Sequence, residues 1–237
     1  MFLRVFLSMC ALFILAMSFY VYRFYRLLAI SEGIIAKTEK YSLSSSDRSK
    51  SLLVLWDSTA VWVGAETKEE SLPALLSKKI RATYVENHGV SGAVVHDVAS
   101  QIALIEHDEY DTILLMIGGN DITRFHTLDR VSDEYRAIFP LLPKHRHLIV
   151  TNCGNLGWAR IFPWFVGRYY EYISRNYHEA FGRIVRSVWG YYVPIFDERS
   201  VDPYIREPEK YLAKDLFHPS SIWYAYWFSK IDFSQVK

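Results

Sequence analysis

Short runs of consecutive apolar residues recur along most of this chain and are separated by amphipathic segments. The clearest run, residues 113–117, reads ILLMI and has no polar side chain for either face of an extended strand. A strand of this kind must be covered on both faces, as strands are in parallel sheets flanked by helices. The run therefore favours an α/β fold with helices on both sides of a parallel sheet.

The order of the segments favours a three-layer α/β/α sandwich. Strands are predicted at residues 52–56, 83–86, 112–117, 147–151 and 191–196. Helices are predicted at residues 71–79, 94–105, 130–139, 168–188 and 221–229. Five strands that alternate with helices predict a doubly wound sheet, in which ligand sites form beyond the carboxyl ends of the strands.

The N-terminus has a different character. Residues 5–22 contain no charged side chain and are flanked by arginines at both ends. A helix of this length extends about 27 Å, close to the thickness of the hydrocarbon core of a membrane. We therefore expect residues 1–30 to form one transmembrane anchor or a signal-like segment. Residues 16–18 could serve as a signal-peptide cleavage site, but the apolar run continues beyond them, which favours retention as an anchor.

The side of the membrane on which the rest of the chain lies stays open. Arg4 alone precedes the apolar run, whereas Arg23, Arg26, Lys37 and Lys40 follow it. The positive-inside rule would keep these following residues cytoplasmic. Short leading anchors with one basic residue also act as export signals, which favours the extracytoplasmic face. We expect a single-pass membrane protein.

The remaining chain divides into a tether and a folded domain. Residues 31–50 are polar and rich in serine, so they are predicted to form a flexible tether, and residues 51–237 form the domain. The formal net charge is +1 without a broad basic field, so nucleic acid is not an expected partner. The two cysteines, Cys10 in the apolar run and Cys153 in the domain, are poorly placed for an intrachain disulfide.

Polar motifs follow three of the predicted strands, and a fourth motif lies near the C-terminus. Each taken alone has an ordinary explanation as a helix cap, a tight turn or an exposed loop. Together they provide a hydroxyl nucleophile, a base, a carboxylate to orient the base and donors for an oxyanion, which ester hydrolysis requires. The motifs are Asp57-Ser58-Thr59, Asn87-His88-Gly89-Val90-Ser91-Gly92, Gly118-Gly119-Asn120-Asp121 and Asp215-Leu216-Phe217-His218.

The residue types indicate specific roles. Ser58 is the candidate nucleophile, and His218 is the candidate general base. Asp215, three residues before His218, is the candidate carboxylate that holds the imidazole tautomer. Asn120 and backbone N–H groups are candidate oxyanion donors.

The order of these motifs resembles the SGNH, or GDSL-type, hydrolase superfamily, and the resemblance covers nearly the whole domain. It implies a flavodoxin-like parallel sheet and a catalytic triad of Ser58, Asp215 and His218. It also implies an oxyanion hole formed by the N–H groups of Ser58 and Gly89 and by the amide of Asn120. No metal or organic cofactor is implied. The substrates implied are esters or thioesters of lipids or small alcohols, and acetylated glycans.

We therefore predict a serine ester hydrolase that cleaves lipid or small acyl esters through an acyl-enzyme on Ser58. One alternative is an acetyl esterase that acts on cell-envelope polysaccharide. Another is a catalytically silent binding protein, because Trp56 stands where the family usually has glycine and could crowd the nucleophile turn. The sequence lacks the G-x-S-x-G motif, which argues against the ordinary α/β-hydrolase fold.

Two further features have less specific interpretations. His145 and His147 share one face of a predicted strand, but no acidic or cysteine ligand accompanies them, so metal binding is not expected. The aromatic segment 158–172 follows the fourth predicted strand, near the expected rim of the active site. It is predicted to pack into the core or, alternatively, to form an acyl-binding wall or a lid that rests on the membrane.

Overall fold

The five predicted strands form one parallel sheet. The computed structural model describes residues 1–236, and for Trp56 only the backbone. Every neighbouring pair of strands is parallel, and the order across the sheet is β2-β1-β3-β4-β5. This is the flavodoxin-like order, in which the direction of the chain across the sheet reverses between β1 and β3. The strands are β1 (Ser51–Trp56), β2 (Tyr84–Asn87), β3 (Glu109–Met116), β4 (Lys144–Thr151) and β5 (Tyr191–Tyr192).

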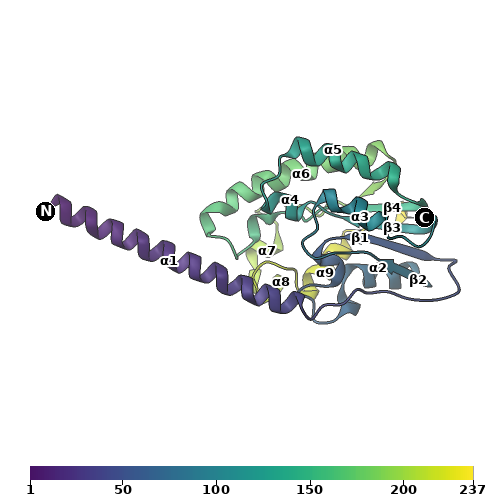
Figure 1. The fold of residues 1–237 in the computed structure, drawn as a ribbon, viewed down its shortest axis with the longest axis horizontal. Helices are drawn as coiled ribbons and strands as arrows, with labels where there is room; N and C mark the ends of the chain where they lie inside the picture. Colours follow the sequence, from purple (N-terminus) through teal and green to yellow (C-terminus); the bar gives the residue numbers. More distant parts are fainter. Residues whose placement is uncertain (237) are drawn as a thin grey trace.

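Helices cover both faces of the sheet, which confirms the predicted three-layer sandwich. On one face α2 (Leu72–Ile80) packs against α9 (Ser221–Ser229), and on the other α5 (Leu128–Ile138) packs against α6 (Gly167–Ser187) (Figure 1). The turn before α3 (Val98–Ile102) contacts α5 and joins the second layer. The remaining short helices of the domain are α4 (Gly119–Thr123), α7 (Pro203–Arg206) and α8 (Pro208–Tyr211).

The centre of the sheet is fully buried. The side chains of residues 52–55 in β1 and 113–115 in β3 are 0% exposed, so these strands are apolar on both faces. At the end of β3, Gly118 has a φ of +120°, and a Cβ there would lie 2.8 Å from the ring of Phe181. Only glycine therefore lets α6 pack this closely against the loop that follows β3.

Two elements are shorter than predicted. The sequence pattern predicts a strand over residues 191–196, but β5 ends at Tyr192, because Pro194 has no N–H to donate to the sheet. The helix predicted over residues 94–105 is a 3₁₀ turn (Val95–Asp97) followed by the short α3. The other predicted strands and helices agree with the structure to within a few residues at each end.

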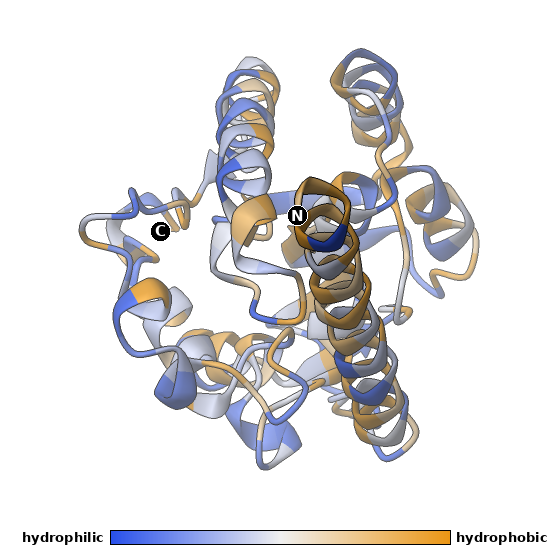
Figure 2. Cartoon of the chain, turned by 90° about the vertical axis from the view of Figure 1, so that its left-hand side faces the viewer, coloured by the Kyte–Doolittle hydropathy of each residue, from blue (hydrophilic) through white to orange (hydrophobic). Residues whose placement is uncertain are grey.

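The N-terminal helix is long and apolar enough to cross a membrane. This helix, α1 (Phe2–Ile35), contains 34 residues, and its most apolar 18-residue window has a mean hydropathy of 2.2 and lies entirely outside the core. The helix projects from the domain in Figure 1, and its outward turns are predominantly hydrophobic in Figure 2. It ends at Ile35, beyond the predicted boundary of the anchor at residue 30.

The last turns of α1 pack against the domain. Leu27 and Ser31 are buried, and Arg23 Nη1 donates a hydrogen bond to the Ile161 carbonyl at 3.3 Å. An isolated anchor would need no such contacts. The helix therefore holds the domain in a defined position relative to its own axis.

The predicted tether is also attached to the domain. Tyr41 is 8% exposed, and Leu43 forms both backbone hydrogen bonds of an antiparallel bridge with Val85 of β2. The serine-rich composition predicts a tether over residues 31–50, and within it the stretch around residues 41–43 lies against the domain. The reason is that β2 is an edge strand, whose free backbone groups take a partner when one lies nearby.

Candidate active site

The loops after β1 and β3 meet where the strand order reverses, and both carry predicted site residues. Ser58 begins a 3₁₀ turn (Ser58–Val61) directly after β1, and Asn120 lies in α4, shortly after β3. Asp57 caps the 3₁₀ turn, because its Oδ1 accepts hydrogen bonds from Thr59 N at 3.0 Å and from Thr59 Oγ1 at 2.9 Å. This cap fixes the backbone that presents the Ser58 hydroxyl.

A histidine from the C-terminal loop reaches Ser58. His218 Nε2 lies 3.2 Å from Ser58 Oγ, and His218 Nδ1 lies 2.6 Å from Asp215 Oδ2. The other oxygen of Asp215 accepts the backbone N–H groups of Phe217 and His218, each at 3.0 Å. Ser58 and His218 are 160 positions apart in the sequence. The fold therefore assembles a continuous chain of contacts from carboxylate to imidazole to hydroxyl.

The environment of Asp215 favours its ionised form. The side chain is 0% exposed, and burial by itself would raise its pKa. The hydrogen bonds and charge of His218 and the N–H of Phe217 outweigh this effect and lower the pKa of Asp215 below its ordinary value. An ionised Asp215 favours the tautomer of His218 that carries its proton on Nδ1, which leaves Nε2 to accept a proton from Ser58.

For Asp57, the effect of burial outweighs that of the hydrogen bonds. Burial raises the pKa of its carboxyl to about 6, against the lowering effect of the two hydrogen bonds from Thr59. Asp57 is therefore a buried acid beside the nucleophile whose ionised form the fold disfavours.

The predicted oxyanion donors are held in different ways. Asn120 lines the cavity beside Ser58, and its Nδ2 donates a hydrogen bond to the Ala93 carbonyl at 2.9 Å. An amide nitrogen carries two hydrogens, so one remains for another acceptor. The Gly89 N–H donates to Asn87 Oδ1 at 2.9 Å. An oxyanion would therefore have to compete with Asn87 for the Gly89 donor.

The cavity at the Ser58 hydroxyl is narrow. Its volume is about 40 Å³, roughly the space that three water molecules need. Apart from the predicted site residues, its walls are mainly apolar. They include Cys153, Leu156, Trp158, Phe217, Trp223 and Trp227.

The aromatic segment 158–172 divides between the core and the surface. Trp158 is 3% exposed, and its ring lies 4.0 Å from that of Trp223, measured between centroids. Trp164 and Phe165 are 77% and 52% exposed, and the ring of Phe165 lies 6.2 Å from that of Tyr20 in α1. Core packing is thus observed for the inner part of the segment, whereas its outer part lies beside the N-terminal helix.

Sequence reasoning missed some residues of the site. The Oγ of Ser31 in α1 lies 3.4 Å from His218 Nδ1, although 187 positions separate the two residues. No motif indicates this contact, because it depends on how α1 docks. Trp223 and Trp227 lie four residues apart on one face of α9, and this spacing was the available signal for a shared wall.

One cluster of potential metal ligands lies outside the site. Ligand atoms of Glu86, Glu106 and His107 lie within 4.8 Å of one another. Glu86 already accepts hydrogen bonds from the hydroxyls of Tyr84 and Tyr110 and from the Glu106 N–H. Both oxygens of Glu86 therefore already accept hydrogen bonds from the protein. These bonds form a structural hydrogen-bond network.

The sequence can also be compared with known families. The model of the GDSL-like lipase/acylhydrolase family matches residues 55–226. This chain belongs to the GDSL-like lipase/acylhydrolase family. The predicted resemblance, and the prediction of a hydrolase acting on ester bonds, are confirmed at the level of the family. No curated protein matches the sequence.

Solved structures with the same fold have distant sequences. The chain is similar to TesA, with a TM-score of 0.60 and 17% identity over 79% of this chain and 98% of that one. It is similar to phospholipase A1 from Streptomyces albidoflavus NA297, with a TM-score of 0.56 and 14% identity over 74% and 94% of the two chains. It is also similar to an acetylxylan esterase from Geobacillus stearothermophilus, with a TM-score of 0.55 and 16% identity over 84% and 96%. At these identities the likeness concerns the fold.

The raised pKa of Asp57 predicts a pH-dependent stability. From about pH 4 to pH 6 the carboxyl ionises in the unfolded chain, where its pKa is 3.8, but stays protonated in the folded one. The free energy of unfolding therefore falls as the pH rises through this window and levels off above it. Asp57→Asn keeps an oxygen for Thr59 but does not ionise. We expect its free energy of unfolding, relative to wild type, to increase between pH 4 and pH 7 in urea titrations in detergent. A constant difference would contradict the raised pKa.

Proposed function

We propose that this chain is a serine ester hydrolase whose acyl-enzyme forms on Ser58, with His218 as general base and Asp215 as the carboxylate that orients it. The observation that carries the proposal is the continuous contact from Asp215 Oδ2 through His218 to Ser58 Oγ, with distances of 2.6 and 3.2 Å. A buried carboxylate, an imidazole and a hydroxyl at these separations meet the geometric requirement for activating a serine.

The first half of the proposed reaction transfers the acyl group to Ser58. Its Oγ attacks the ester carbonyl carbon while His218 Nε2 takes the hydroxyl proton, and Asp215 stabilises the resulting imidazolium. Asn120 Nδ2 and the N–H of Ser58 stabilise the charge on the carbonyl oxygen, together with the N–H of Gly89 once it leaves its present acceptor. His218 then returns the proton to the leaving alcohol. Water repeats the sequence to release the acid.

The proposed enzyme is anchored to a membrane by α1. The helix has the length and hydropathy for one crossing, and Tyr20 and Tyr25 near the end of its apolar run are suited to an interface. Leu27 and Ser31 pack against the domain and keep the catalytic serine close to that interface. The substrate is therefore an acyl ester at or near a membrane, and the extracytoplasmic face is the favoured side.

The size of the catalytic cavity favours short acyl groups. A volume of about 40 Å³ between Trp158, Trp223 and Trp227 accommodates a group the size of acetyl, whereas a long acyl chain requires these walls to move. This favours small acyl esters, including the acetylated glycans of the alternative function, over fatty acyl esters.

The proposal predicts that Ser58 reacts with a serine-directed fluorophosphonate probe. The full-length wild type should be labelled, because the probe captures an activated hydroxyl, and Ser58→Ala should abolish the labelling. Ser234→Ala, which removes an exposed hydroxyl near the C-terminus, is the matched control and should be labelled like wild type. Absence of labelling of folded wild type would favour the silent binding protein suggested by Trp56.

Loss of one oxyanion donor gives a second test. Asn120→Ala should lower kcat for p-nitrophenyl acetate by about 10²- to 10³-fold, because its amide acts mainly in the transition state. Thr123→Ala is the control, since the Thr123 hydroxyl donates only to the Asn120 carbonyl at 3.1 Å and leaves the amide in place. A near-unchanged kcat for Asn120→Ala would remove this residue from the site.

The cavity volume predicts a preference for short chains. In a series of p-nitrophenyl esters the wild type should have its highest kcat/KM for acetate. Trp227→Phe should raise the ratio of butyrate to acetate activity several-fold, because a smaller ring widens the acyl site. Trp189→Phe makes the same exchange at a residue that is 97% exposed and should not change the ratio. Equal activity of the wild type on acetate and octanoate would refute the size argument.

A further inference from the structure

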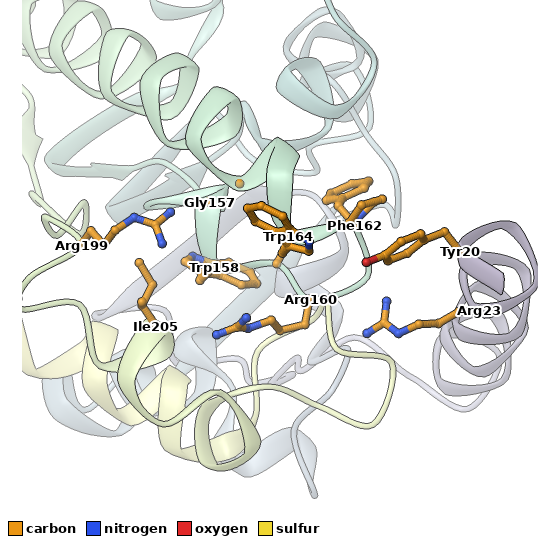
Figure 3. Close-up of a pocket in the computed structure, with 12 residues that line it drawn as sticks. Tyr20, Arg23, Gly157, Trp158, Arg160, Phe162, Trp164, Arg199 and Ile205 are labelled. Atoms are coloured by element: carbon orange, nitrogen blue, oxygen red, sulfur yellow. The ribbon is translucent and has the colours of Figure 1, made fainter. Parts of the chain in front are cut away.

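A second and larger cavity lies between α1 and the domain. Its volume is about 400 Å³. Tyr20 and Arg23 of α1 face residues 157–167 across it in Figure 3. Trp158 lines both this cavity and the catalytic one. The two cavities are therefore adjacent at Trp158.

The lining of the larger cavity is positively charged. It contains Arg23, Arg160 and Arg199, and its described lining residues include no aspartate or glutamate. Arg199 Nε donates to Glu171 Oε2 at 2.8 Å, so its charge is partly compensated. Within the described part of the chain, Arg23 and Arg160 have no acidic partner at ion-pair distance. The cavity thus offers guanidinium groups to an anion.

A buried donor in the same wall also requires an acceptor. Trp158 is 3% exposed, and its indole Nε1 has no hydrogen-bond partner among the described residues. Trp158 and Arg199 both line this cavity (Figure 3). Gly167 begins the 21-residue helix α6 at this wall, and no acidic or capping side chain occupies its first turn. An unpaired buried N–H, a guanidinium and a helix N-terminus all favour an anion with several acceptor oxygens.

The cavity lies at the end of the apolar span. Tyr20 belongs to the uncharged run of residues 5–22, and Arg23 is the first charged residue after it. The exposed rings of Trp164 and Phe165 lie on the domain side, and Phe165 contacts Tyr20. With α1 in a bilayer, this is the level at which tryptophan and tyrosine side chains and lipid headgroups meet. The anionic group of a headgroup is a phosphate in most membrane lipids.

We propose that this cavity binds a phosphate group on the alcohol part of a membrane-embedded ester and thereby places the ester carbonyl at Ser58. The inference rests on the proposed esterase function. The short acyl group occupies the smaller cavity, and the alcohol passes Trp158 to the larger one. There the phosphate oxygens accept hydrogen bonds from Arg23, Arg160 and the Trp158 N–H. A soluble phosphate ester shares this chemistry, but the position beside α1 favours the lipid.

The test compares two lipids that differ only in the phosphate. Full-length protein in detergent micelles is given 1-O-hexadecyl-2-acetyl-glycerol 3-phosphate or 1-O-hexadecyl-2-acetyl-glycerol, and acetate release is measured. We expect kcat/KM to be about tenfold or more higher for the phosphate-bearing lipid, which corresponds to one or two charge-assisted hydrogen bonds. A ratio near one for the wild type would overturn the proposal.

Exposed arginines provide the matched variants. Arg160→Gln should bring the ratio of the two kcat/KM values close to one, and Arg160→Lys should keep part of the preference because it keeps the charge. Arg183→Gln removes an exposed arginine from the far half of α6, outside both cavities, and should leave the ratio as in wild type. An equal loss in Arg160→Gln and Arg183→Gln would show that the preference comes from net charge alone and would overturn the site.

Three further measurements distinguish a lipid phosphate from a soluble one, and the phosphate site from the esterase function. If monoacetyl glycerol 3-phosphate shows the same advantage over monoacetylglycerol, the phosphate site stands and its lipid source is wrong. If p-nitrophenyl acetate is hydrolysed by wild type while the lipids give equal rates, the esterase stands and only the phosphate site fails. If wild type hydrolyses no ester, the proposed function fails. Tryptophan fluorescence of Ser58→Ala titrated with 1-O-hexadecyl-glycerol 3-phosphate then decides whether the cavity binds phosphate, and Arg160→Gln in that background should weaken binding.

Discussion

Burial of both faces of the parallel sheet is the constraint on which the rest of this structure depends. Each strand must be covered from two sides, so the chain returns through helices and all strands end at one edge. That edge collects Ser58 after β1 and Asn120 after β3, and the segment after β5 brings Asp215 and His218 to the same place. The contacts among them are a product of topology, since no two of the loops adjoin in sequence.

Two buried aspartates near Ser58 show how partners, and not burial alone, decide charge. Asp215 is bound by an imidazole and by two backbone N–H groups, and its pKa is lowered. Asp57 is bound by one threonine, and its pKa is raised to about 6. The difference lies in the number and charge of the donors that replace water. One carboxyl is thereby suited to orient a base, and the other serves to shape the turn.

Most of the fold and the proposed site could be predicted from local signals. Apolar runs marked the strands, and polar motifs at the strand ends marked Ser58 and its partners. A local signal was also available for the bond from Gly89 to Asn87, because asparagine commonly accepts from the residue two positions later. Docking of α1 could not be predicted, since it depends on a complementary surface formed elsewhere. The arginine-lined cavity was equally hidden, because its three arginines, Arg23, Arg160 and Arg199, come from separate segments.

Because α1 is one continuous helix, it fixes how far His218 lies from the end of the uncharged run. Tyr22 ends the uncharged run, and Ser31, whose hydroxyl lies beside His218, is nine residues further along the same helix. Nine helical residues rise about 14 Å, which exceeds the roughly 6 Å depth of the headgroup layer on one side of a bilayer. With α1 crossing upright, His218 stands beyond the headgroups. An ester at the boundary of the acyl chains therefore reaches Ser58 only when its lipid is lifted partly out of the bilayer.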